Sequence, residues 1–484
     1  MGYSVSRRDA LRFGVLVAGT VGGLAVGGGT GDAAPAASGS AAADPPSPMP
    51  RLAQAWQQAP QILRRITPPA FPDATFDVTD YGAVGDGSTD CTAAIRAAVA
   101  ACAQAGGGHV RVPAGTFVSG AIHLQSGVDL HLEAGATIQG STDLNQYLPN
   151  VYTRWQGIEC YNYSPLIYAY GQHDVAVTGT GTIDGQGTVA PWHSWGGGGA
   201  DWTALQQMGA DGVPVEQRQF GDGHKLRPNM IQFYRCDNVL VSDLTLINPP
   251  MWTVHPVLCH NVTVRALTVH STISNGDGCD PECSSDVYIW GCRFDTNDDC
   301  IAIKAGRDAD GRRVNIPSQD IVVENCDFSG RWGGITIGSE MSGGVRNVFA
   351  RDCRVNPADF PGKYPVKYAL YAKTNQARGG YIEDIYLKDF TGQNVDRQAL
   401  FVTMNYSGGD DQTFYPAVER IAVQGMLIDG AQAVLSLDGL ATDHLVDVTV
   451  ANSEFSNITG QDTVDYTDDL TLFHVTVNGQ PAGA

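Results

Sequence analysis

Two short clusters of carboxylates in the middle of the chain could carry out acid–base chemistry. Asp277 lies in the stretch 275–282, and Asp298 and Asp299 follow in the stretch 295–304. Crowded carboxylates repel one another, so the pKa of at least one should rise while the others stay ionised. A protonated carboxyl group beside an ionised one is the acid and base pair that hydrolysis of a glycosidic bond needs.

The local backbone decides whether these aspartates can share one site. Adjacent side chains of a regular strand point to opposite faces, so Asp298 and Asp299 can act together only at a corner of the chain. The turn-rich sequence from Thr296 to Asp299 favours such a corner. The spacing alone leaves two other interpretations open: solvated turn residues, or a Ca²⁺ site built from carboxylates.

A repeated pattern indicates the elements that position these aspartates. Each repeat begins with Asn or Asp, continues with apolar residues at alternate positions and ends in a turn. Its six clear copies start at Asn238, Asn261, Asp286, Asp320, Asn347 and Asp384. This irregular spacing is typical of coils of a parallel β-solenoid with loops of different length between the strands. The starting residues are interpreted as turn residues that tolerate the left-handed conformation.

The register of the repeat predicts a continuous interior. The residues six positions after each start are all apolar or cysteine: Leu244, Leu267, Cys292, Cys326, Cys353 and Phe390. We therefore expect an all-β fold, with most of the 11 cysteines serving as small core residues. The only convincing helix spans 90–104 and should cap the N-terminal end of the solenoid. The stretch 191–226 interrupts the repeat and is expected to be a long surface loop.

Composition and the N-terminus limit the class of protein. The net charge of −21 argues against a nucleic-acid-binding surface. Arg7 and Arg8 precede a short, weakly apolar stretch, which predicts a twin-arginine signal and its cleavage region over 1–43 and therefore secretion. We expect a linker or N-terminal extension over 44–72 and a single catalytic domain over 73–484. No uninterrupted apolar run is long enough to predict a membrane span after signal removal.

Several motifs in one order resemble glycoside hydrolase family 28, the polygalacturonase-like pectin hydrolases. They are the stretches 81–90, 275–277, 297–304 and 337–344. The resemblance implies a right-handed parallel β-helix that hydrolyses with inversion. It also implies that Asp298 is the general acid, while Asp277 and Asp299 hold and deprotonate the attacking water. An inverting pair is expected to have carboxyl groups roughly 6.5–9.5 Å apart.

Two positions depart from the pattern of that family. Trp332 stands where the family usually has His, and Tyr371 replaces the Arg of an Arg-x-Lys motif whose Lys is kept as Lys373. Trp offers a flat apolar face, and Tyr carries no charge to pair with a uronate carboxylate. We expect Arg378 to compensate for the lost Arg. These departures predict altered recognition of the sugars near the cleavage point.

Further residues are expected to contact the substrate. They are Trp252, His255, Asn275 and Glu340. A segment near 154–161 is expected to close one end of the groove, which would make the enzyme trim chain ends. Its candidate residues are Arg154, Trp155, Glu159 and Tyr161.

The sequence predicts a glycosidase that acts, as a monomer, on a pectic polysaccharide or oligosaccharide without a cofactor or metal. An enzyme of the same family acting on a rhamnogalacturonan-type or other neutral-sugar linkage remains an alternative. A Ca²⁺-dependent polysaccharide lyase and a non-enzymatic carbohydrate-binding β-helix are weaker alternatives. No phosphate loop, nucleotide fingerprint or ordered set of zinc ligands is found.

Overall fold

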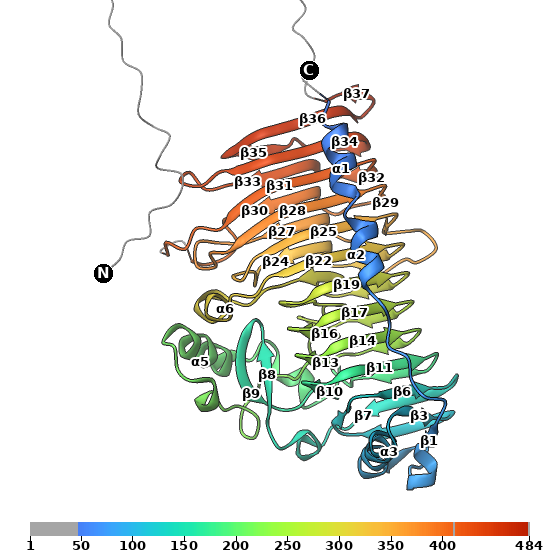
Figure 1. Ribbon diagram of the computed structural model, residues 1–484. Coiled ribbons are helices and arrows are strands. Elements are labelled where there is room, and N and C mark those ends of the chain that lie inside the picture. The colour runs from blue at the N-terminus through green and yellow to red at the C-terminus, as the bar shows by residue number, and fades with distance from the viewer. Residues whose placement is uncertain (1–46, 410–411, 483–484) are drawn as a thin grey trace, which may run out of the picture. The chain divides into compact units, whose positions relative to one another are not determined.

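The computed structural model describes residues 47–409 and 412–482, which form a parallel β-helix (Figure 1). The predicted twin-arginine signal over 1–43 lies outside these residues. Each regular coil contributes one strand to each of three stacks, and neighbouring strands within a stack run parallel. No helix in the described part of the chain is long and apolar enough to cross a membrane.

The three stacks use the strands in turn. The first stack contains β1 (Thr75–Asp77), β3 (Gly108–Val112), β6 (Val128–Leu132), β11 (His173–Gly179), β14 (Asp237–Ser242), β17 (His260–Arg265), β19 (Ser285–Trp290), β22 (Ser318–Glu324), β25 (Val345–Arg351), β28 (Tyr381–Lys388), β31 (Ala417–Gln424), β34 (Leu445–Ile458) and β36 (Thr467–Val477). The second contains β2 (Asp86–Asp90), β4 (Gly115–Ser119), β7 (Ala136–Gly140), β12 (Thr182–Asp184), β15 (Thr245–Ile247), β18 (Thr268–Ser271), β20 (Arg293–Thr296), β23 (Asp327–Gly330), β26 (Arg354–Val355), β29 (Thr391–Gln393) and β32 (Leu427–Ala431). The third contains β5 (Ile122–His123), β10 (Ile167–Tyr170), β13 (Ile231–Tyr234), β16 (Val254–Val257), β21 (Ile301–Ile303), β24 (Gly333–Gly338), β27 (Tyr368–Lys373), β30 (Gln398–Thr403), β33 (Ala433–Asp438) and β35 (Thr463–Asp465).

The predicted repeat is confirmed at its starting positions. All six starting residues have positive φ, between 53° and 58°. Asn and Asp tolerate this conformation because their short side chains bond locally. They also bond across coils, as where Asn261 Nδ2 donates to Asn238 Oδ1 at 2.6 Å and Asn347 Nδ2 donates to Asp320 Oδ1 at 2.9 Å.

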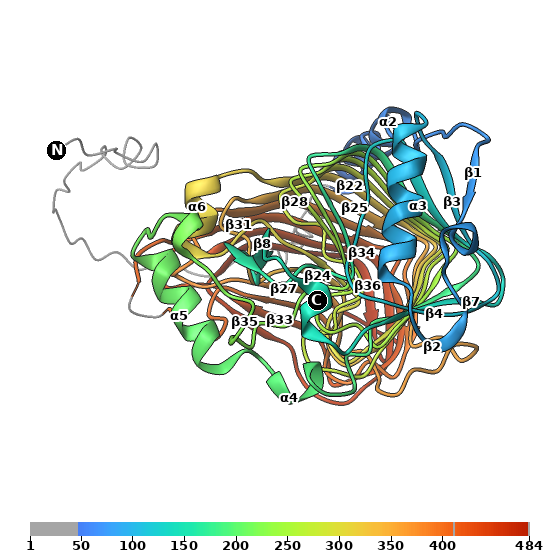
Figure 2. The ribbon, with the colours of Figure 1, turned by 90° about the horizontal axis from the view of Figure 1, so that it is seen from below.

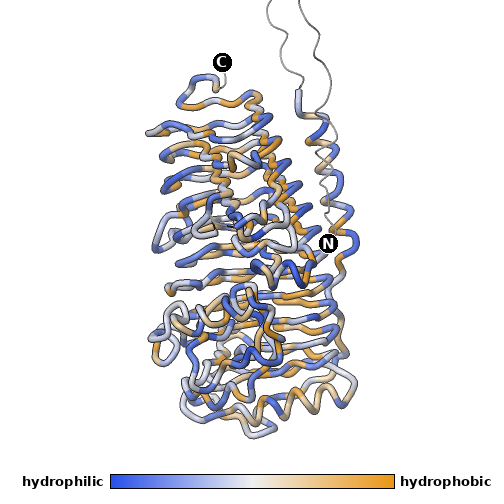
Figure 3. The backbone as a smooth tube through the Cα atoms, turned by 90° about the vertical axis from the view of Figure 1, so that its left-hand side faces the viewer, coloured by the Kyte–Doolittle hydropathy of each residue, from blue (hydrophilic) through white to orange (hydrophobic). Residues whose placement is uncertain are grey.

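The predicted interior column is confirmed as well. The six residues from Leu244 to Phe390 that were expected to stack inside are all buried. All 11 cysteines are buried and carry free thiols. Hydrophobic stretches recur in successive coils (Figure 3). One interior register therefore runs through these coils, and the cysteines at it are packing residues.

The expected capping helix is α3 (Thr92–Gln104), which packs on the strands of the first coils (Figure 2). Asp90 Oδ1 accepts a hydrogen bond from the backbone N–H of Thr92 at 2.9 Å, so Asp90 supports the start of the helix. Ile95, Val99 and Cys102 are buried against the core. The helix covers apolar side chains and strand edges that an uncapped solenoid would expose.

Two helices occupy the segment that was expected to be a linker or extension. They are α1 (Met49–Trp56) and α2 (Ala59–Arg65), and they run along the outside of the first stack (Figure 1). Leu52, Ala55 and Ile62 pack against outward-facing residues of successive first-stack strands, including Phe349 and Tyr386. These outward-facing apolar residues of the first stack give the two helices a surface on which to bury their own apolar faces, which explains why so short a segment is helical.

The prediction of a long surface loop over 191–226 is largely wrong, because much of this segment is helical. It contains α4 (Trp192–Trp195) and α5 (Gly199–Ala210), whose Leu205 is buried beside Ile158. The antiparallel hairpin of β8 (Val151–Trp155) and β9 (Ile158–Asn162) belongs to the same cluster. A further helix, α6 (Asp308–Val314), follows β21, and the short antiparallel strand β37 (Gln480–Pro481) pairs with β36.

The third stack is interrupted at one coil. Between β16 and β21 the chain over 272–284 has no regular strand there and makes only single bridges, such as Val254 to Cys279 and Cys279 to Ile301. Gly278 lies within this segment, and a Cβ added to it would approach the carbonyl oxygen of Cys300 to 2.5 Å. The coil that carries Asp277 is thus pressed closely against the next one.

Candidate active site

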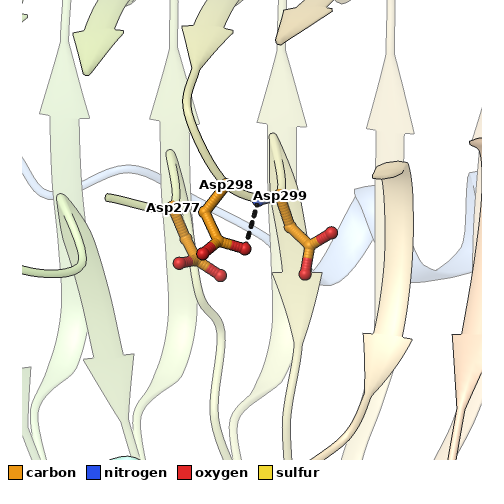
Figure 4. A group of neighbouring side chains, drawn as sticks. All are labelled: Asp277, Asp298 and Asp299. Carbon is orange, nitrogen blue, oxygen red and sulfur yellow. Dashed lines mark hydrogen bonds between the residues drawn. The ribbon is translucent and has the colours of Figure 1, made fainter. Parts of the chain in front are cut away.

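The three aspartates singled out in the sequence meet at this interruption. Asp298 and Asp299 lie in the turn between β20 and β21, and Asp277 lies in the irregular segment one coil before (Figure 4). One oxygen of each residue lies within 4.8 Å of the others. The corner predicted for Asp298 and Asp299 is confirmed. The nearest oxygens lie closer together than the roughly 6.5–9.5 Å expected between the carboxyl groups of an inverting pair, because stacked coils bring the two clusters together. The expected spacing is therefore not met, and inversion rests on the resemblance to the family.

Backbone and side-chain donors fix two of the three carboxylates. Asp298 accepts hydrogen bonds from the N–H groups of Asn275 and Asp299, each at 3.0 Å. Asp299 accepts from the N–H of Gly333 at 2.9 Å, from Thr336 Oγ1 at 2.9 Å and from Lys373 Nζ at 2.8 Å. Strands β24 and β27 therefore fix the direction of Asp299, whereas the irregular segment and the turn itself fix that of Asp298.

Asp277 is held much more loosely. Its Oδ1 has no hydrogen-bond partner among the described residues, and its Oδ2 lies 3.8 Å from Lys304 Nζ. Burial raises the pKa of Asp277 well above its usual value, and the charge of Asp298 adds to this effect. Burial and the charge of Asp299 likewise raise the pKa of Asp298. The crowding expected from the sequence is thus present.

A cavity of about 300 Å³ opens beside the three aspartates. Five other predicted residues line it: Trp252, Asn275, Trp332, Glu340 and Lys373. The remaining lining residues were not singled out from the sequence: Gln156, Lys304, Arg307, Ser339, Tyr406 and Ser407. Asp298 and Trp332 keep part of their surface exposed, whereas Asp277 and Asp299 are buried.

Cations balance part of the negative charge of the cavity. Lys304 Nζ lies 3.3 Å from Glu340 Oε2, and Arg307 Nη1 lies 2.9 Å from Glu340 Oε1. Burial alone would raise the pKa of Glu340, but Lys304 and Arg307 hold it well below its usual value. Burial alone would lower the pKa of Lys373, but the Asp299 carboxylate holds it well above its usual value. Glu340 and Lys373 are therefore charged.

Three residues predicted to contact the substrate stay outside the cavity lining. His255 is fully buried, and its Nε2 lies 2.8 Å from Glu282 Oε2. Tyr371 is buried and stacks on Phe401, with ring centroids 5.3 Å apart. Arg378 is buried as well, with its Nε donating to Ser339 O at 2.7 Å and its Nη1 bonded to Asp308. Arg378 was expected to replace the charge of the lost Arg toward the substrate. Its donors are instead occupied by Ser339 and Asp308, so it holds the cavity residue Ser339 in place.

The hairpin of β8 and β9 reaches the cavity only at its tip. Gln156 lines the cavity, and Gly157 O accepts a hydrogen bond from the N–H of Arg307 at 3.0 Å. Arg154 and Glu159, which were expected to close the groove, are buried and pair with each other at 3.4 Å. Trp155 is buried against Trp202, and Tyr161 lies outside the cavity lining. The expected segment thus contributes, but through a residue that carried no sequence signal.

Residues 102–436 match the sequence profile of Glycosyl hydrolases family 28. This chain belongs to that family. It is 29% identical over 391 residues to a probable polygalacturonase of Vitis vinifera, covering 78% of this chain and 73% of the relative. It is 27% identical to an exo-poly-alpha-D-galacturonosidase of Dickeya chrysanthemi, covering 70% of this chain and 58% of that relative.

Solved structures agree with the fold. The chain is 39% identical to a hyperthermoactive exopolygalacturonase from Thermotoga maritima, with a TM-score of 0.83 over 88% of this chain and 96% of the other. The predicted right-handed parallel β-helix is confirmed. A family 28 chain is a glycoside hydrolase, so the prediction of a glycosidase is confirmed too.

The residues of the family 28 site fall into two sets: those in the family motifs, which the sequence revealed, and those from loops, which it did not. Motif residues such as Asp298 were found because they recur at fixed places in the family. Lys304 is the last residue of one of those motifs and lines the cavity. The only sequence signal for this was its position directly after apolar residues of a strand. Arg307, Tyr406 and Ser407 come from loops that follow β21 and β30, and no periodicity marks such positions.

Proposed function

We propose that this chain hydrolyses a pectic polyuronate from the chain end, with inversion at the anomeric carbon. The observation that carries the proposal is the group formed by Asp277, Asp298 and Asp299 on the wall of a cavity that also presents Lys304 and Arg307. Carboxylates do the acid–base work, and cations suit a substrate that bears carboxylates of its own.

Asp298 is assigned the role of general acid. Its raised pKa keeps a proton available, and its partial exposure lets a glycosidic oxygen approach. As the bond from the anomeric carbon to the leaving oxygen breaks, the Asp298 proton passes to that oxygen. The leaving sugar departs with a hydroxyl group, and Asp298 is left as a carboxylate.

Asp277 and Asp299 are assigned to the attacking water. Three donors hold the Asp299 carboxylate in place, so Asp299 is the base, and the free Oδ1 of Asp277, whose pKa is raised, accepts a hydrogen bond from the water without taking its proton. The water oxygen forms the new bond to the anomeric carbon, and its proton passes to Asp299. That proton later returns to Asp298 through solvent, which restores the site.

Two observations support action at the chain end. Gln156 at the tip of the β8–β9 hairpin, with Tyr406 and Ser407 from the loop after β30, gives the cavity walls that an open groove lacks. The similar proteins from Dickeya chrysanthemi and Thermotoga maritima are both named as exo-acting. A substrate whose terminal sugar fills the cavity would be cut close to its end.

A rhamnogalacturonan-type linkage is the second candidate. Trp332 on the cavity wall brings an apolar face where the family usually has His, and the buried Tyr371 brings no cation where it usually has Arg. Both replacements favour a neutral or deoxy sugar at one subsite. The Ca²⁺-dependent lyase that the sequence left open is disfavoured because the chain belongs to a glycoside hydrolase family, and only the close approach of the three aspartates would suit a Ca²⁺ ion.

One experiment separates these candidates. The purified protein is incubated with polygalacturonate and with rhamnogalacturonan, with and without a chelator, and the products are analysed by mass. We expect saturated monosaccharide from polygalacturonate at a rate that the chelator does not change. Unsaturated products would identify a lyase, and products from rhamnogalacturonan alone would favour the second candidate. Proton NMR of the first product formed reports whether the anomeric configuration is inverted.

Export by the twin-arginine route is proposed on the sequence Ser6–Arg12. Replacing Arg7 and Arg8 by Lys in the full-length chain should retain the protein inside cells that export the unaltered chain. Appearance of the double variant in the medium at the usual level would contradict this route.

A further inference from the structure

A loop beside the cavity carries cations that the proposed mechanism does not use. The loop spans 356–367, between β26 and β27, and accounts for the largest spacing between successive repeats. It folds back on the end of β23, since Gly330 N donates to Tyr364 O at 3.0 Å and Lys367 N donates to Trp332 O at 2.9 Å. Prolines at 357, 361 and 365 restrict its backbone, so its side chains are presented in a preset arrangement.

Cations and aromatic rings alternate along this contact. Lys367 Nζ lies 3.4 Å from the ring centroid of Trp332. The ring of Tyr364 lies 5.3 Å from Lys363 Nζ and 5.5 Å from the Arg331 guanidinium carbon. These distances are within the range of cation–π attraction. The five residues are called the cationic strip below.

The cations of the strip are not neutralised. None of Arg331, Lys363 and Lys367 forms an ion pair with a described residue, although the chain has a net charge of −21. Burial lowers the pKa of Lys367, and the nearby charges of Arg331 and Arg397 lower it further. The charges of Asp396 and Asp298 offset this effect only in part, so the cations, which are crowded together and form no ion pair, leave this place open for an anion from outside.

The strip is continuous with the active site. Trp332 belongs both to the strip and to the cavity wall, on which Asp298 also lies. Arg331 and Lys363 are exposed and lie farther along the same loop contact, so the strip leads from the cavity toward solvent.

We propose that the cationic strip is a subsite that binds a uronate residue of the substrate beyond the two sugars joined by the cleaved bond. The cations pair with the uronate carboxylate, and Tyr364 offers its ring to the sugar. This subsite rests on the proposed function and adds cationic contacts farther along the chain than the position where Tyr371 provides no charge. The sugar chain leaves the cavity along the strip, past Trp332.

The test compares substrates that differ in length and in charge. The double variant Arg331→Gln/Lys363→Gln is compared with Lys388→Gln, a matched lysine that lies 6.0 Å from the ring of Trp56 on the helix-covered side. Specificity constants are measured on digalacturonate and tetragalacturonate. Binding of tetragalacturonate and of its methyl ester is measured by calorimetry in the Asp298→Asn background, which removes turnover.

We expect the double variant to lose about fivefold to tenfold on tetragalacturonate in both measurements, since partly exposed ion pairs each contribute little. The loss should be smaller on digalacturonate and absent for binding of the methyl ester, while Lys388→Gln matches the unaltered chain. An equal loss on both lengths, an equal loss with the ester, or no loss would overturn the subsite. Failure of the unaltered chain to hydrolyse or bind either uronate would instead overturn the proposed function, and the subsite with it.

Discussion

Two clusters of buried carboxylates lie on the coils around the cavity, and they differ in their hydrogen bonds. In the paired cluster, both oxygens of Glu282 are bonded, to Arg154 at 3.0 Å and to His255 at 2.8 Å. Glu159 accepts from Tyr234 at 2.6 Å and pairs with Arg313. In the aspartate cluster, comprising Asp277, Asp280, Asp298 and Asp299, three buried oxygens have no hydrogen-bond partner in the described part of the chain.

The pKa values of Glu159 and Glu282 shift in the opposite direction from those of Asp277, Asp280 and Asp298. Burial acts to raise the pKa at all five, but Arg154 outweighs it at Glu159, whose pKa falls to about 2. The Arg154 charge and the His255 hydrogen bond also lower the pKa of Glu282. Burial prevails at Asp277 and Asp280, whose pKa values are raised well above the usual one. The carboxylates of the paired cluster lie outside the cavity lining and pair with buried cations, so they are structural, whereas Asp277, Asp298 and Asp299 line the cavity, so they are available for chemistry.

The largest effect is expected where the aspartate cluster loses its acid. Asp298→Asn should lower kcat by about 10³-fold, since a general acid contributes typically 10²–10⁴-fold. Folding should be preserved, because the amide is nearly isosteric with the carboxyl group. Initial rates on polygalacturonate and the thermal unfolding midpoint check both parts. Near-normal hydrolysis would remove Asp298 from the role of acid.

Breaking the paired cluster should reduce stability instead. Arg154→Met leaves the buried Glu282 and Glu159 without their shared cation, which should lower the free energy of unfolding by about 3–5 kcal/mol. Unfolding in urea measures this, with Asp298→Asn as the comparison that keeps the cluster intact. A stability equal to that of the unaltered chain would show that the paired cluster is not structural.

The contrast also explains what the sequence could predict. Asn238, Cys326 and Phe390 were placed correctly because each coil repeats the same backbone turn and the same interior position. His255 was expected to contact the substrate, since its sequence neighbour Trp252 does line the cavity, yet its ring points to Glu282. Arg307 was missed because it reaches the cavity from a loop, where contacts depend on the whole fold and on no local period.

Removing one unpartnered carboxylate should stabilise the protein above acidic pH. Neither oxygen of the buried Asp280 is hydrogen-bonded, and burial raises its pKa well above the unfolded value of about 4. The folded state therefore keeps its proton more tightly, and stability is lost as pH rises from the unfolded pKa toward the folded one. Asp280→Asn abolishes this loss.

We expect Asp280→Asn to match the unaltered chain near pH 4 and to be about 1–3 kcal/mol more stable at neutral pH. Urea unfolding across this pH range measures the difference. A variant that is less stable at neutral pH would mean that Asp280 is ionised and serves Lys304, whose Nζ lies 3.7 Å from Asp280 Oδ1.

The smallest effect is expected from breaking an exposed ion pair, and it shows whether burial or ion pairing as such makes the paired cluster stabilising. Arg51 on α1 also pairs with a carboxylate, through Nη2 to Asp447 Oδ1 at 2.7 Å, but 56% of its side chain is exposed. Arg51→Met should therefore cost at most about 1 kcal/mol, because water and salt screen an exposed pair. Urea unfolding at low and high salt should show this small loss fading with salt, while the loss in Arg154→Met persists. Equal losses in the two variants would mean that exposure does not separate the two kinds of ion pair.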